Sequence, residues 1–170
     1  MIVGVCGHRP ARLGDSDPSS PLRRFLRGEL SRTLAKLGAS LVWSGGALGA
    51  DEDACHAALE RGLPFCLALP FPGYTARWST RQRRRFQLLK QQAREWLFVS
   101  DRAPCGRQEA AALYRARNLF LVRQVDHLVA VWDGGEGGTA QTVRLARSLG
   151  RSVTVIDPRQ EGRSHANPIP

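Results

Sequence analysis

With 170 residues the chain has the length of one domain, and a domain of this size buries about two-thirds of the surface that its unfolded chain exposes. No apolar run reaches the roughly 20 residues that a membrane span needs, and the N-terminus lacks the basic region and small-residue cleavage site of a signal peptide. The net charge of +10 points to an anionic partner, but Lys36 and Lys90 are the only lysines, so a general preference for arginine explains the charge as well.

The four cysteines form no CxxC pair. Cys6 and Cys66 fall in apolar runs, where a free cysteine behaves as a small buried hydrophobe. The other two cysteines are Cys55 and Cys105. Reduced thiols are typical of the cytoplasm, so we expect a cytoplasmic protein without a disulfide framework.

The start of the chain predicts a strand, a loop and a helix. Residues 2–6 form a short apolar run, and residues 13–20 contain the turn residues of a loop. The helix begins near Pro21, a residue favoured in the first turn. Apolar residues then recur at three- and four-residue spacing as far as Gly38, which is suited to a helix end.

The middle of the chain continues the alternation. Strands are expected at residues 41–43 and 65–69, with a helix between them that ends near Arg61. An arginine-rich helix is expected over about residues 80–95, and residues 96–99 are expected to form a short extended piece.

The last third repeats the same order. A helix begins near Gln108, and an apolar run of strand length begins at Val125. A second helical pattern follows Thr139, a natural N-cap residue. Residues 153–156 predict a last strand, and residues 158–170 predict a polar tail with little to bury.

Strands that alternate with helices indicate an α/β fold. The sheet should be mainly parallel, contain about five strands and be covered by helices on both faces. We expect a single domain over residues 1–157 and the tail over 158–170. In such a sheet, ligands bind beyond the carboxyl ends of the strands.

One predicted strand ends in a turn with four glycines in five positions, directly before a helix. Glycine lets backbone N–H groups approach a phosphate closely, and a helix N-terminus adds partial positive charge. We therefore expect a phosphate cradle, although a tight turn without a ligand has the same pattern. The cradle residues are Asp133, Gly134, Gly135, Gly137, Gly138 and Thr139. Glu136, within this turn, would repel a phosphate unless it points away or binds a ribose hydroxyl.

Two further strands also end in glycine turns. The first turn contains Gly7, and the second contains Ser44, Gly45, Gly46 and Gly49. Because the carboxyl ends of parallel strands meet at one edge, the three turns should converge on one site. That convergence is stronger evidence than any single glycine-rich turn.

Taken together, these motifs resemble those of the SLOG superfamily, which includes DNA-processing protein A and the Lonely Guy phosphoribohydrolases; the similarity is greatest to the YpsA-like branch. The motifs are Gly7-His8-Arg9-Pro10, Ser44 to Asp51, Leu69-Pro70-Phe71 with Trp78, Arg117-Asn118 and Gly137-Gly138-Thr139. The resemblance spans residues 2 to about 157. It implies a Rossmann-like three-layer fold, a homodimer or higher homo-oligomer, and binding of a nucleotide or nucleotide derivative without a further cofactor.

The chain departs from the Lonely Guy pattern at one position. Those enzymes carry a glutamate three residues after the threonine of the glycine motif and use it to cleave the N-glycosidic bond. Here that position is Thr142. Phosphoribohydrolase activity would therefore need Glu136, Asp51 or Glu52 as a substitute.

Several side chains have both a ligand-binding and a structural interpretation. Arg9 either binds a phosphate with its guanidinium or makes a surface salt bridge. His8 either donates to the ligand or holds its own loop, and Asp51 either binds a ribose hydroxyl or caps a helix. Arg117 and Asn118 either face the base or phosphate or form a structural hydrogen-bonded pair.

Other residues are more ambiguous still. Trp78 and Tyr74 either stack on a base, which contributes roughly 1–3 kcal/mol in single-strand binders, or fill the core under a loop. Asp53 and His56 share a helical face, but two ligands without a clear third make a poor metal site, so we expect no metal. The arginines of the expected helix over 80–95 form either a solvated face or a nucleic-acid contact. They are Arg81, Arg83, Arg84 and Arg85.

Three functions follow from these patterns. The leading hypothesis is a sensor or sequestering protein for an ADP-ribose-like ligand or another nucleoside phosphate. The second is an enzyme that cleaves an N-glycosidic or phosphate bond with Asp51 or Glu136 as the carboxylate. The third is binding of single-stranded nucleic acid, with an affinity that falls steeply with salt.

Overall fold

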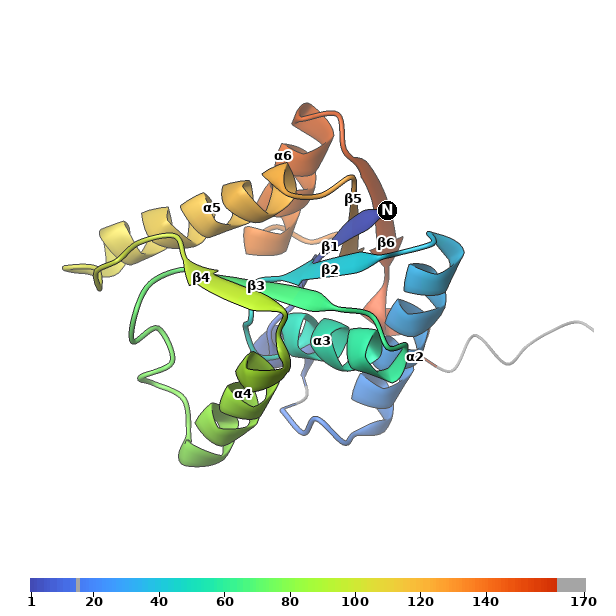
Figure 1. Ribbon diagram of the computed structural model, residues 1–170, viewed down its shortest axis with the longest axis horizontal. Helices are drawn as coiled ribbons and strands as arrows, with labels where there is room; N and C mark the ends of the chain where they lie inside the picture. Colours follow the sequence, from blue (N-terminus) through green and yellow to red (C-terminus); the bar gives the residue numbers. More distant parts are fainter. Residues whose placement is uncertain (15, 162–170) are drawn as a thin grey trace, which may run out of the picture.

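The computed structural model describes residues 1–14 and 16–161 (Figure 1). The strands are β1 (Ile2–Gly7), β2 (Leu41–Ser44), β3 (Phe65–Leu69), β4 (Glu95–Phe98), β5 (His127–Val131) and β6 (Ser152–Ile156). The helices are α1 (Pro10–Leu13), α2 (Pro21–Lys36), α3 (Ala50–Glu60), α4 (Thr80–Gln92), α5 (Arg107–Arg123) and α6 (Gly138–Ser148). Pro158–Gln160 form a 3-10 turn, and the rest of the expected tail, from residue 162, lies outside the described residues.

The described strands form one parallel sheet in the order β4-β3-β2-β1-β5-β6. The predicted α/β class and Rossmann-like fold are thereby confirmed, with six strands in place of about five. The additional strand is β4, which the sequence predicted only as a short extended piece. It pairs with β3, Glu95 beside Cys66, at the edge of the sheet. Edge strands lack the continuous apolar run that identifies a central parallel strand.

Helices cover both faces of the sheet (Figure 1). On one face α2, α3 and α4 pack around Leu26, Leu30 and Leu34, which are fully buried and four residues apart on one side of α2. On the other face α5 and α6 bury Leu121 and Val143 against the strands. No helix in the described part of the chain is both long and apolar enough to cross a membrane.

β1 lies between β2 and β5, which are far apart in the sequence. After β1 the chain continues to α2 on one face of the sheet, and after β5 it continues to α6 on the other face. The two connections therefore diverge at the carboxyl ends of the strands and leave a crevice between them. Gly7 allows close packing here. A Cβ on Gly7 would lie 2.5 Å from the Cβ of Ala50 and 2.7 Å from that of Val131.

The two helices that begin near this crevice start at glycines. Gly49 precedes α3 with φ 94°, and Gly137 precedes α6 with φ 139°. The predicted N-cap role of Thr139 is therefore wrong, as is the interpretation of Asp51 as a cap. Each lies at the second position of its helix, because the chain enters both helices through a backbone conformation that favours glycine. The short helix α1, directly after β1, was not predicted.

A buried ion cluster joins three helices on the α2 face. Arg23 of α2 is fully buried and forms ion pairs with Asp53 and with Glu52 of α3, the latter at 3.1 Å. Arg27 lies 3.4 Å from Asp53, and Arg85 of α4 lies 3.0 Å from Glu52. Charges this deeply buried are tolerated only when they are paired. We refer to these five residues as the buried ion cluster.

Candidate functional site

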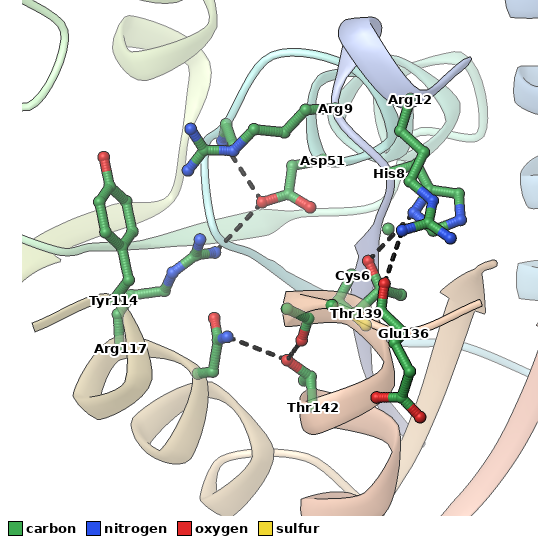
Figure 2. Close-up of a pocket in the computed structure, with 15 residues that line it drawn as sticks. Cys6, His8, Arg9, Arg12, Asp51, Tyr114, Arg117, Glu136, Thr139 and Thr142 are labelled. Carbon is green, nitrogen blue, oxygen red and sulfur yellow. Dashed lines mark hydrogen bonds and ion pairs between the residues drawn. The ribbon is translucent and has the colours of Figure 1, made fainter. Parts of the chain in front are cut away.

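A pocket of about 270 Å³ opens in the crevice beyond β1 and β5 (Figure 2). Its walls come from the segment after β1, the turn after β2, α5 and the start of α6. The residues predicted from the sequence that line it are Gly7, His8, Arg9, Asp51, Arg117, Asn118, Gly137, Gly138 and Thr139.

The N-terminus of α6 forms one wall of this pocket. The N–H groups of Gly138 and Thr139 belong to the first turn of the helix and have no acceptor among the described residues. Gly138 is exposed, and nothing lies within 4 Å of the place where its Cβ would be. An anion can therefore reach bare backbone amides at the positive end of an 11-residue helix.

Arg12 of α1 fixes the glycine loop that leads into α6. Its Nε and Nη2 donate to the two carboxylate oxygens of Asp133, both at 3.2 Å, and its Nη1 donates to the carbonyl oxygen of Glu136 at 2.6 Å. A Cβ on Gly135 would lie 2.0 Å from Nη2. Gly135 therefore makes room for an arginine of the protein itself.

Asp133 and His8 hold the same loop from its inner side. Asp133 Oδ1 accepts the Gly135 N–H at 2.9 Å, and this bond, with those from Arg12, holds the pKa of Asp133 well below its usual range. The Asp133 N–H donates to Nε2 of the buried His8 at 3.1 Å, and Nδ1 of His8 lies 3.4 Å from Thr139 Oγ1. These contacts favour the interpretation that His8 holds its loop.

Glu136 does not place its charge in the pocket. Its carboxylate forms a bidentate pair with Arg144 of α6, with both N···O distances at 3.0 Å. Figure 2 shows the Glu136 side chain directed away from Arg9 and Asp51. An anion at the start of α6 therefore meets the backbone of Glu136 and not its carboxylate.

A buried ion pair forms the opposite wall. Nη1 of Arg117, on α5, donates to Asp51 Oδ2 at 3.1 Å, and the same oxygen accepts the Ala47 N–H at 3.3 Å. Both side chains are less than one-tenth exposed, and Nε of Arg117 is buried without an acceptor in the described part of the chain. A Cβ on Gly45 would lie 1.1 Å from Arg117 Nη1. Gly45, like Gly135, makes room for a guanidinium.

Arg9 stands at the rim of the pocket without an acidic partner among the described residues. Its guanidinium carbon lies 5.0 Å from the centroid of the Tyr114 ring on α5, a cation–π contact that leaves the N–H groups available. Arg9 is exposed, whereas Arg117 and Asp51 neutralise each other. Arg9 therefore carries the pocket's uncompensated positive charge within the described region.

Asn118 of α5 and Thr142 of α6 form a hydrogen-bonded contact between the two helices in the pocket lining. Asn118 Nδ2 donates to Thr142 Oγ1 at 2.9 Å, and that hydroxyl donates to the Gly138 carbonyl oxygen at 2.9 Å. Asn118 is thus a hydrogen-bonded link between the helices. Thr142 lines the pocket at the position of the Lonely Guy glutamate and brings no carboxylate there.

The remaining predicted site residues support the pocket or lie away from it. Asp133, Gly134 and Gly135 belong to the supporting loop, and Ser44 Oγ donates to the Asp51 carbonyl oxygen at 2.9 Å. Gly46 and Gly49 lie behind the pocket wall and do not line it. Gly49 packs closely against the backbone of His8 and against Pro10.

The structure does not bring Trp78 to the pocket. Trp78 packs edge-on against Tyr74 and Phe86, with ring centroids 5.4 and 5.6 Å away. The Tyr74 hydroxyl donates to the Gly46 carbonyl oxygen at 3.0 Å. This arrangement matches the alternative that both rings fill the space under the loop after β3.

The lining also contains residues that were not predicted to bind a ligand: Cys6, Arg12, Ala47 and Tyr114. Arg12 and Tyr114 bring the charged and aromatic side chains among them. Tyr114 lies three residues before Arg117 and four before Asn118, so helical spacing on α5 could have placed it on the same face. Arg12 had no such signal, because α1 is a single turn and its partners lie more than 120 residues away in the sequence.

The pocket offers no metal site or activated thiol. Asp51 pairs with Arg117 while Asp53 pairs with Arg23, so the two carboxylates are turned to different partners. In the described residues, no group of three or more His, Cys, Asp or Glu side chains could hold a metal ion. Cys6 lines the pocket, but burial raises the pKa of its thiol, which keeps it protonated.

We expect Gly135→Ala to loosen the glycine loop at the pocket without unfolding the protein. The new Cβ would displace the Arg12 guanidinium, which can swing into solvent because Arg12 is an exposed, flexible side chain. The free energy of unfolding should fall by about 1 kcal/mol or less, because the Arg12–Asp133 ion pair that is lost is partly exposed. The loosened loop should lower the affinity of the start of α6 for an anion about tenfold, with AMP as the probe. Urea unfolding and calorimetric titration measure the two quantities; a large loss of stability would contradict the expected movement of Arg12.

Comparison with known proteins identifies relatives along most of the chain. The family model described as DNA recombination-mediator protein A matches residues 12–167. A UPF0398 protein of Bacillus pumilus (strain SAFR-032) is 25% identical over 146 residues, covering 81% of this chain and 76% of the relative. A UPF0398 protein of Lactobacillus delbrueckii subsp. bulgaricus is 26% identical over 138 residues, with 78% and 72% covered.

Solved structures share the fold. DNA processing protein A from Helicobacter pylori, described for its single-stranded DNA binding mode, is 22% identical with a TM-score of 0.63, covering 92% of this chain and 65% of that one. The molybdenum cofactor carrier protein of Chlamydomonas reinhardtii is 21% identical with a TM-score of 0.53, covering 91% and 74%. At these identities the likeness establishes a common architecture.

Proposed function

The chain belongs to the family of DNA recombination-mediator protein A within the SLOG superfamily, and on this basis we propose that its pocket binds the phosphate of a nucleotide or nucleotide derivative. The observation that carries the proposal is the pair of N–H groups at Gly138 and Thr139, which have no acceptor among the described residues and line an open pocket beside Arg9, itself without an acidic partner in that part of the chain. An ADP-ribose-like ligand or another nucleoside phosphate fits this chemistry.

The bonding of the candidate carboxylates favours ligand binding without turnover over catalysis. A general acid or base needs a carboxylate free to exchange a proton near the scissile bond. Asp51 is bonded to Arg117 and the Ala47 amide, Glu136 to Arg144, and Glu52 lies in the buried ion cluster. We therefore propose a sensor or sequestering protein over a hydrolase.

Titration calorimetry with AMP, ADP-ribose, NAD and adenosine tests the proposal. We expect saturable binding of the phosphorylated compounds, with AMP bound at least about tenfold more tightly than adenosine, because only AMP meets the charge-assisted bonds at α6. Arg9→Gln should lower the affinity for AMP by a similar factor, since Arg9 is a cation of the pocket without an acidic partner among the described residues.

Two further results would change the assignment. Equal binding of AMP and adenosine, or no binding by any compound, would remove the phosphate site. Release of free base from AMP or NAD during incubation would replace sequestration with hydrolysis. The matched control is Arg84→Gln, which removes one exposed arginine on α4 away from the pocket and should change no affinity.

A further inference from the structure

A second hollow, of about 380 Å³, lies beside the pocket on the other side of Tyr114. It opens between the loop after β3 and the start of α5, and Tyr114 lines both hollows. We call it the Tyr114 recess. Its lining also includes Phe71, Tyr74, Arg77 and Arg107.

The recess has fixed aromatic walls. Phe71 is buried and meets Tyr114 edge-to-face, with ring centroids 5.6 Å apart, and it meets Tyr74 in the same way at 6.4 Å. The Tyr74 ring is held by its hydroxyl, which donates to the Gly46 carbonyl oxygen. Walls that are already packed against one another can receive a planar ring without first becoming ordered.

The charge at the recess has one sign. Arg77 and Arg107 are exposed on its rim, and neither has a carboxylate within ion-pair distance in the described chain. Within the part of the chain that the structure describes, no acidic residue lines the recess. By contrast, Arg12, Arg23 and Arg117 all have carboxylate partners. The recess therefore combines aromatic surface with two cations left available for an external anion.

We propose that the Tyr114 recess is a second subsite for the same ligand, taking a base and its outer phosphate while the first phosphate lies at the start of α6. This inference rests on the proposed function. It assigns the ligand to a chemical class, linear nucleotides that carry phosphates on two successive units. Tyr114, shared by the two hollows, separates the two units. A mononucleotide occupies half of such a site.

Calorimetry with AMP and the 5′-phosphorylated dinucleotide pApA tests the subsite. The wild-type protein should bind pApA at least about tenfold more tightly than AMP, because the second unit adds stacking and charge-assisted contacts. The double variant Arg77→Gln/Arg107→Gln should lose this preference and keep its affinity for AMP. Both side chains are exposed, so the fold should be retained, which circular dichroism checks.

Arg123→Gln is the matched control. Arg123 is exposed on the same helix as Arg107, sixteen residues further on, which corresponds to about 24 Å along an α-helix. This variant should change neither affinity. A change as large as that of the double variant would mean that net charge, and not the recess, governs binding, and would overturn the subsite.

The remaining outcomes separate the two proposals. Equal affinity of the wild-type protein for AMP and pApA, or a preference that survives in the double variant, would overturn the subsite and leave the phosphate site in place. Absence of binding by both would overturn both proposals. A twelve-nucleotide single strand that binds far more tightly than pApA would overturn the two-unit limit and make the recess part of a longer nucleic-acid track.

Discussion

Gly45→Ala should abolish detectable AMP binding and destabilise the protein. The new Cβ would lie 1.1 Å from Arg117 Nη1 and 2.6 Å from Asp51 Oδ2, so the buried guanidinium must leave its place. Arg117 is less than one-tenth exposed, so its guanidinium can move only into the pocket that it lines, whereas that of Arg12 already reaches solvent. Overpacking a buried site costs about 1–3 kcal/mol, and separation of a buried ion pair about 3–5 kcal/mol. We expect a loss of about 3 kcal/mol.

The measurements are urea unfolding and calorimetric titration with AMP. Gly28→Ala is the matched control, because Gly28 lies inside α2 with room for a Cβ, and alanine there should stabilise the helix by about 0.5–1 kcal/mol. The double variant Gly45→Ala/Arg117→Ala relieves the overlap, so its loss of stability should be smaller than the sum of the losses of the two single variants. If Gly45→Ala behaves like Gly28→Ala, the close contact with Arg117 is not a feature of the folded protein.

Arg23→Met should cause the largest loss of stability in the chain, about 3–5 kcal/mol, because it leaves buried carboxylates without their cation. Asp53 is fully buried, and among the described residues Arg27, at 3.4 Å, would be the one cation left in ion-pair contact with it after the change. A domain of ordinary stability has about 5–15 kcal/mol in total. The variant should therefore be partly unfolded at moderate temperature.

The deficit of Arg23→Met should grow with pH. Burial raises the pKa of Asp53 from 3.8 to about 6, so the stability linked to this group is present below pH 3.8 and is lost as the pH rises through about 6. Arg23 lowers the pKa of Asp53, so its removal should raise the pKa of Asp53 in the folded protein further. Urea unfolding at pH 5 and pH 8 should show a smaller deficit at pH 5.

Arg32→Met, on the same helix, is the control for this prediction. Arg32 is 59% exposed and pairs with Glu29 on the surface, so its replacement should change stability by at most about 0.5 kcal/mol at either pH. The double variant Arg23→Met/Asp53→Leu removes both charges and should recover much of the loss. An unchanged loss in the double variant would assign the effect of Arg23 to packing alone.

The order of strands and helices could be predicted because it rests on local patterns. The periodicity between Pro21 and Gly38 predicted a helix, and the structure has α2 over Pro21–Lys36. Residues 65–69 were expected as a strand and form β3. Strand β4 was underestimated, because an edge strand that begins at Glu95 has no distinctive apolar pattern.

The sequence predicted where the site lies, but it predicted fewer of the contacts that its residues make. Parallel strands bring their carboxyl ends together, so the turns at Gly7 and Gly137 were expected to meet, and both line the pocket. The glycine pattern alone does not reveal what each glycine approaches. Gly45 and Gly135 were expected to face a phosphate, whereas their nearest neighbours are Arg117 and Arg12. Contacts between residues 72 and 123 positions apart leave no local signal.

The overlap between the place of a Gly45 side chain and the guanidinium of Arg117 couples the two positions during evolution. A mutation at position 45 to any larger residue is tolerated only after the arginine at 117 has been shortened or lost. The change at 117 in turn frees Asp51 from its partner. Homologues should therefore keep Gly45, Asp51 and Arg117 together or replace all three. An alignment of close relatives would then show covariation among these positions.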